Sequence, residues 1–236
     1  MRRSRVGAAP KTKLGRREGI RSQAVYFLIV SEGEKTEPNY FASFAMNRRP
    51  EEIHIEIEGA GRNTCSLVRY ALAKRAELEW LLHRQFDRVW VVFDKDDFPD
   101  RDFNEAIRMA EQEDIHLAWS NQAFELWFLL HFELPRGAID RREFRPRLEH
   151  LIQQGHPKYN RKRRYRYKKN ATNMRRILID AGGFVERAKR NAQALRERFT
   201  DTNYAQHNPC TTVDLLVEEL EHPETVLLER VKSSLA

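Results

Sequence analysis

The chain alternates short strand-like stretches with longer helix-like stretches, and this alternation restricts the fold more than any other feature. The strand-like stretches are AVYFLIV (24–30), IHIEIEG (53–59), RVWVVF (88–93) and IHLAWS (115–120). Each of the first three is followed by apolar residues spaced three or four apart, as in a helix that buries one face. Strands connected in this way favour a mainly parallel sheet with right-handed crossovers and helices on both faces. The sequence therefore predicts an α/β fold.

Helices are expected in both halves of the chain. Between the strands, helical spacing predicts helices at 37–45, 64–83 and 102–114. Beyond the last strand, it predicts helices at 122–132, 140–154, 171–199 and 211–222. We therefore expect a basic, flexible arm at 1–23, an α/β core at 24–135, and a helical extension at 136–236 that packs on the core.

Positive charge is concentrated in two segments. The formal net charge is +7, yet residues 1–23 hold eight Lys or Arg against one acid, and residues 158–169 hold eight with no acid. The rest of the chain is net acidic. Segregated cations favour a polyanionic partner, because each one that meets a phosphate releases a counterion. Nucleic acid is the expected partner, and a disordered, merely solvated surface loop is the alternative for residues 158–169.

Nothing in the sequence predicts a membrane or a disulfide. No apolar run approaches the ~18 residues that a membrane helix needs, and the basic N-terminal segment is not followed by a signal-type apolar block. Cys65 and Cys210 lack zinc-site spacing and are expected to be reduced thiols. We therefore expect a cytoplasmic protein without a membrane partner.

Carboxylates follow two of the predicted strands. Glu32 and Glu34 come after the first strand, and Asp94, Asp96 and Asp97 come after the third. Ligands of such sheets bind outside the carboxyl ends of the strands, so the two groups are expected at one edge. If the third strand stays extended, Asp94 and Asp96 point to the same side. Clustered carboxylates repel unless a cation offsets them, and oxygen ligands suit Mg²⁺ or Mn²⁺. A solvated loop with helix capping is the alternative.

Four blocks in this order resemble a known family. FLIVSEGE with VVFDKDD resembles the Toprim signature of topoisomerases, primases and OLD-type nucleases. SEGEKTEPNYF, FDKDDF, SNQAFELWFLLHF and NPCTTVDLLVEEL, which span about residues 24–221, are more closely similar to the RloB-like family of restriction-linked, abortive-infection proteins. This resemblance implies a Toprim-like, Rossmann-like sheet with a helical elaboration, a role in bacterial defence against phage, and an ATPase on a separate chain.

The resemblance also implies roles for individual residues. Glu32, beside Gly33, matches the Toprim glutamate that acts as general acid or base, and Asp94 and Asp96 match its metal ligands, with Asp97 as a candidate third. Lys168 matches a Tyr-x-Lys pattern and would stabilise charge on a phosphoryl group. Topoisomerases also need a nucleophilic tyrosine, and none of the seven tyrosines here can be assigned to that task. Hydrolysis by a metal-bound water is therefore the simpler expectation.

The basic segment 158–169 mixes cations with tyrosines, as phosphate attraction plus base stacking would require. The nucleic-acid-binding candidates are Arg161, Lys162, Arg163, Arg164, Tyr165, Arg166, Tyr167, Lys168 and Lys169. Glu125, in the apolar stretch 122–132, is a further catalytic candidate, because Asn121 and Glu125 are four residues apart and could line the same edge. A buried structural hydrogen bond is the alternative.

Together these features predict a Mg²⁺-dependent nuclease that cleaves RNA, tRNA included, or DNA. The alternative is a non-catalytic Toprim-like module that binds nucleic acid or serves as a scaffold for the ATPase. A homo-oligomer is compatible with either function.

Overall fold

The computed structural model describes residues 24–46, 48–49, 53–61, 64–161 and 164–235. The expected arm at 1–23 lies outside these residues, as do two of the nucleic-acid-binding candidates, Lys162 and Arg163. Among the described residues, no helix is long and apolar enough to span a membrane.

All four predicted strands are present and form one parallel sheet within the described part of the chain. They are β1 (Val25–Ser31), β2 (Ile53–Gly59), β3 (Arg88–Asp94) and β4 (His116–Ser120), in the order β2-β1-β3-β4. β1 is central, with Val30 opposite Glu58 of β2 and Val91 of β3. The α/β class with a parallel sheet is confirmed.

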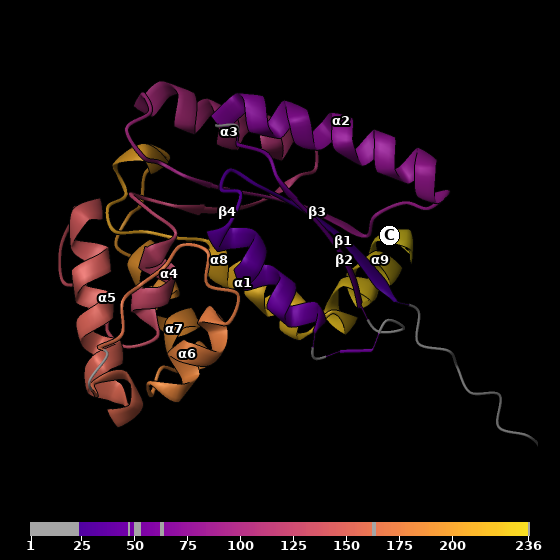
Figure 1. Cartoon of the computed structure of the whole chain (residues 1–236). Helices are drawn as coiled ribbons and strands as arrows, with labels where there is room; N and C mark the ends of the chain where they lie inside the picture. The colour runs from indigo at the N-terminus through magenta and orange to yellow at the C-terminus, as the bar shows by residue number, and fades with distance from the viewer. Residues whose placement is uncertain (1–23, 47, 50–52, 62–63, 162–163, 236) are drawn as a thin grey trace, which may run out of the picture.

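Helices cover both faces of the sheet, as the alternation predicts (Figure 1). α2 (Thr64–Leu82) and α3 (Asp100–Gln112) lie on one face, where they pack against inward side chains such as Leu28 and Val91. α1 (Thr36–Ala45) lies on the other face with Phe27. Because β1 and β3 are covered on both faces, they are apolar throughout rather than alternating.

The helices after β4 differ in part from the prediction. They are α4 (Glu125–Leu130), α5 (Arg141–Gly155), α6 (Met174–Asp180), α7 (Val185–Arg196), α8 (Val213–Glu221) and α9 (Glu224–Leu235), with 3₁₀ turns at Pro157–Tyr159 and Tyr204–Gln206. The single helix expected at 171–199 is wrong, because Gly182 adopts a φ of +84° and separates α6 from α7. α4 is shorter than expected, and α9 was not predicted.

The second half of the chain completes the first half's core. The apolar cluster on the α1 face includes Trp90 and Val92 of β3 together with Leu216 and Leu220 of α8. The segment before α8 also lies against β4, where Thr212 N donates to Trp119 O at 2.9 Å. One continuous apolar core therefore contains residues from both sides of the expected boundary at 135/136.

Candidate functional site

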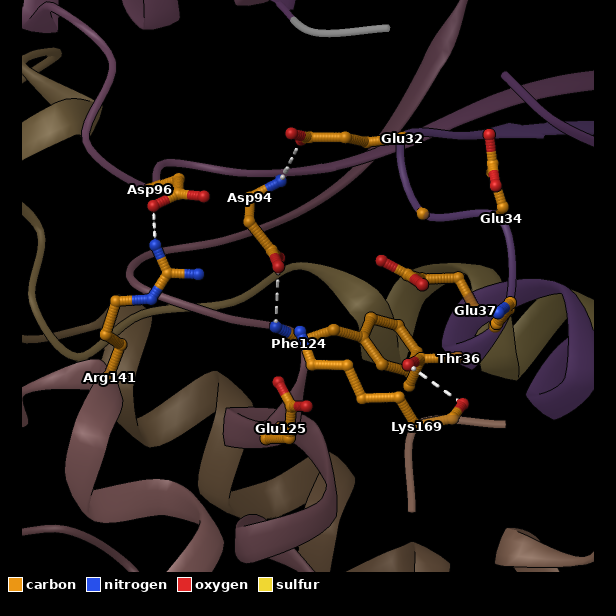
Figure 2. Close-up of a pocket in the computed structure, with 12 residues that line it drawn as sticks. Glu32, Glu34, Thr36, Glu37, Asp94, Asp96, Phe124, Glu125, Arg141 and Lys169 are labelled. Atoms are coloured by element: carbon orange, nitrogen blue, oxygen red, sulfur yellow. Dashed lines mark hydrogen bonds and ion pairs between the residues drawn. The ribbon is translucent and has the colours of Figure 1, made fainter. Parts of the chain in front are cut away.

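A cavity of about 300 Å³ lies at the carboxyl ends of β1 and β3 (Figure 2). Carboxylates from several segments line it, namely Glu32, Glu34, Glu37, Asp94, Asp96 and Glu125. Three cations, Lys35, Arg141 and Lys169, also line it. The cavity is therefore built from β1, α1, β3, α4, α5 and the basic segment, at the edge where such sheets bind ligands.

The turn after β1 fixes Glu32 and leaves room for Glu37. Glu32 N donates to Val92 O at 2.8 Å, and the Ser31 hydroxyl donates to Gly33 O at 2.7 Å. A Cβ atom at Gly33 would collide with the Glu37 carboxylate. Glycine at this position therefore allows the Glu37 side chain of α1 to fold back over the turn.

Asp94 and Glu32 meet at this edge, as their positions after two parallel strands predict. Asp94 N donates to Glu32 Oε2 at 3.2 Å, and Asp94 Oδ2 accepts from Phe124 N at 3.0 Å. These hydrogen bonds connect the ends of β1 and β3 to the start of α4. Acids some sixty residues apart in the chain are thus brought into one cavity.

The neighbours of Asp94 are arranged differently from the expectation. β3 ends at Asp94, and Asp96 adopts a φ of +41°, so the extended geometry expected past residue 93 is wrong. Asp96 still lines the cavity, where its carboxylate forms an ion pair with Arg141. The side chain of Asp97 is 98% exposed and does not line the cavity, which corrects its expected place among the metal ligands. Lys95 turns away to Asp100 at 3.1 Å.

The electrostatics of the cavity favour uptake of positive charge. Burial, followed by repulsion from Glu125 and Glu32, raises the pKa of Glu37 to about 7. Burial and the neighbouring carboxylates raise the pKa of Asp94 well above its usual value, and burial raises that of Glu32. These carboxylates therefore release their protons at higher pH than usual, and a metal ion that bound them would compete with those protons.

The donor atoms of the cavity suit Mg²⁺ or Mn²⁺ in kind, because they are carboxylate oxygens without thiolates or imidazoles. Their positions are not those of a formed metal centre. Among the described residues, no group of three or more His, Cys, Asp or Glu has an arrangement that could hold a metal ion. Asp94 with Glu32 and Glu37 are the residues that could hold one after side-chain rotation, whereas Asp96 is paired with Arg141.

Glu125 is the first residue of α4, and its side chain is buried at the cavity wall. The Tyr167 hydroxyl donates to Glu125 Oε1 at 2.8 Å. Lys168 is exposed and does not line the cavity, but the next residue, Lys169, does. The structure thus places Lys169, rather than Lys168, where a cation could act on a bound phosphoryl group. Asn121 instead makes a buried structural hydrogen bond to Ala205 O at 2.8 Å.

The two tyrosines proposed for base stacking are turned into the protein. Tyr167 is only 6% exposed, and the half-buried Tyr165 packs against the same apolar cluster with its hydroxyl 3.5 Å from Met174 Sδ. Their expected stacking on nucleic-acid bases is therefore wrong for this conformation. The described cations Arg161, Arg164, Arg166, Lys168 and Lys169 are exposed and remain available to phosphates.

Glu37 and Arg141 line the cavity but were not among the site residues predicted from the sequence. Glu37 carried a usable signal, because it lies in the first turn of a helix that directly follows the first strand and its acidic turn. Arg141 carried no usable signal in the sequence, because it meets Asp96 only through the tertiary packing of α5.

A sequence model of the family described as RloB-like protein matches residues 27–220. A search of curated proteins and a search of solved structures each gave no match.

Proposed function

Because the chain belongs to the RloB-like protein family, we propose that it is a Mg²⁺-dependent phosphodiesterase that cleaves nucleic acid in bacterial defence against phage. The convergence of Glu32, Glu37, Asp94 and Glu125 in one cavity at the carboxyl ends of β1 and β3 supports this proposal most strongly. Burial raises the pKa values of Glu32, Glu37 and Asp94, which makes their charged forms costly to maintain, and such groups cluster where a cation or a reaction needs them.

In this proposal Asp94 would hold the metal together with Glu32 and Glu37, and Asp96 could join them only if it left Arg141. A bound Mg²⁺ would supply a water of lowered pKa and would neutralise charge on the phosphate. Glu32 would act as the general base or would orient the attacking water, and its carboxylate accepts a hydrogen bond from Asp94 N. Lys169 supplies positive charge to the phosphoryl oxygens.

A cleavage assay on RNA and DNA with and without Mg²⁺ tests the proposal. Asp94→Asn and Glu32→Gln should lose cutting and keep nucleic-acid binding, because the exposed cations of the basic segment are unchanged. Asp97→Asn is the matched control, since it removes an exposed carboxylate three residues from Asp94 outside the cavity, and it should cut like the wild type. Equal cutting by all of these proteins would rule out the assignment.

The second candidate is a non-catalytic Toprim-like subunit that binds nucleic acid or serves as a scaffold for an ATPase. The ion pair between Arg141 and Asp96 favours it, because a guanidinium there already balances one carboxylate. This candidate predicts metal-independent binding and no cutting by the wild type. The family resemblance supports a separate ATPase partner, and co-purification with proteins encoded beside it, together with size measurement for a homo-oligomer, tests assembly.

A further inference from the structure

A second cavity of about 280 Å³ adjoins the acidic cavity, with which it shares Glu125, Arg141 and Lys169 as walls. Its character is different. Arg145 adds a third cation, Glu125 is its one acidic lining residue, and Phe144 contributes an apolar surface. The hydroxyl of Tyr167, another wall residue, already hydrogen-bonds the Glu125 carboxylate. Cations therefore outnumber acids among the residues that line the second cavity, although Arg141 also pairs with Asp96 outside this lining.

A buried carboxylate holds Arg145 beside this cavity. Glu149 of α5 is only 5% exposed and accepts from Arg145 Nε at 3.2 Å, Arg166 Nη1 at 2.8 Å and Tyr167 N at 2.9 Å. Burial alone would raise the pKa of Glu149, but these hydrogen bonds lower it overall, so it stays ionised. One carboxylate thus fixes two guanidiniums close together and leaves their other N–H groups free for an outside anion.

The contrast between the cavities defines what each can bind. The carboxylates of the acidic cavity suit a dication. Three cations around a small recess instead suit the non-bridging oxygens of a phosphate group. A volume of about 280 Å³ is just below the ~300–1,000 Å³ of small-ligand pockets, so the cavity has room for a phosphate with its sugar and not for a whole base pair. The shared wall places such a phosphate next to the group bound in the acidic cavity.

We propose that the second cavity is a phosphate subsite that binds, through Arg141, Arg145 and Lys169, the backbone phosphate adjacent to the one in the acidic cavity. The position of this phosphate next to the one being cleaved rests on the proposed nuclease function. Phosphate binding by the second cavity does not depend on that function. It gives α5 a part in substrate binding that the basic segment alone would not supply, and it predicts preference for single-stranded segments.

Fluorescence anisotropy with short labelled single-stranded RNA and DNA, in EDTA and with the full chain, tests the subsite without any cleavage. Arg145→Gln should raise Kd about tenfold, as for loss of one hydrogen bond between charged groups. It should also make the slope of log K against log salt less steep by about 0.7. The control is Arg142→Gln on the same helix, whose side chain is 85% exposed, pairs with Asp140 and lines neither cavity. It should leave Kd and slope unchanged.

The outcomes separate this proposal from the function it rests on. If Arg145→Gln binds like Arg142→Gln, or if both weaken binding equally, the subsite is overturned even when metal-dependent cutting is found. If only Arg145→Gln weakens binding while no protein cuts, the phosphate subsite stands and the nuclease function falls. Equal dependence of duplex and single-stranded binding on Arg145 would overturn the preference for single strands.

Discussion

Replacing Glu37 with glutamine should remove a large pH-dependent loss of stability. The pKa of Glu37 rises from 4.5 to about 7 in the folded protein, with burial as the main cause. At ~1.4 kcal/mol for each pH unit between these two values, ionising Glu37 costs the folded state about 3 kcal/mol. The folded state holds this proton more tightly than the unfolded chain. The stabilisation of the folded state by this proton is therefore complete below pH 4.5 and is lost as the pH rises through 7.

Urea unfolding followed by tryptophan fluorescence measures this effect in EDTA at several pH values. The free energy of unfolding of Glu37→Gln, minus that of the wild type, should increase by about 3 kcal/mol between pH 4.5 and pH 7 and stay constant above it. His131, whose burial lowers its pKa to about 4, acts in the opposite direction, but both proteins keep it and its effect cancels.

Glu34→Gln is the control, because it removes an exposed carboxylate from the same turn and should leave the pH dependence of the wild type unchanged. A difference between Glu37→Gln and the wild type that stays flat over this pH range would refute the reasoning. It would mean that burial and the neighbouring carboxylates do not raise the pKa of Glu37 in the folded protein.

Three further predictions follow from the same contacts. Mg²⁺ should raise the urea unfolding midpoint of the wild type more above pH 7 than below pH 4.5, because protons and the cation compete for the same carboxylates. Equal shifts of the midpoint at the two pH values would contradict this competition. Leu216→Ala should lower the free energy of unfolding by ~2–5 kcal/mol, because Leu216 is fully buried. Leu215→Ala, at a position 46% exposed on the same helix, should lower it far less, and similar losses for the two variants would contradict the packing. Arg196→Met should lower the free energy of unfolding in urea by ~3–5 kcal/mol, because it leaves the buried Asp214 carboxylate without its bidentate guanidinium partner. A loss below ~1 kcal/mol would count against a buried ion pair.

The strands were predictable because their signal is local. β1 and β3 are uninterrupted apolar runs covered on both faces, and β2 alternates because one of its faces is less covered. The break between α6 and α7 was also encoded locally, at Gly182 and Gly183, but good helix formers on either side outweighed it in the sequence reading.

The candidate site was predictable only to the extent that it follows the strand ends. Glu32 and Asp94 meet because they leave neighbouring parallel strands at the same edge. Arg141 and Lys169 reach the cavity through tertiary packing of α5 and the basic segment, which no spacing in the sequence encodes. The tyrosines were misjudged because an extended segment buries alternate side chains, so cations and rings that are neighbours in sequence face opposite ways.

The late position of α8 has a consequence for synthesis of the protein. Leu216 and Leu220 cover part of the sheet face that also contains Trp90, yet the last strand of the sheet ends at Ser120, long before α8 begins at Val213. A nascent chain that has completed β4 still exposes this apolar face, so the acidic cavity cannot become stable until translation is nearly finished. Chains released early should therefore expose apolar surface and be substrates for chaperones and proteases, and under the nuclease function proposed above they would also lack a formed acidic cavity.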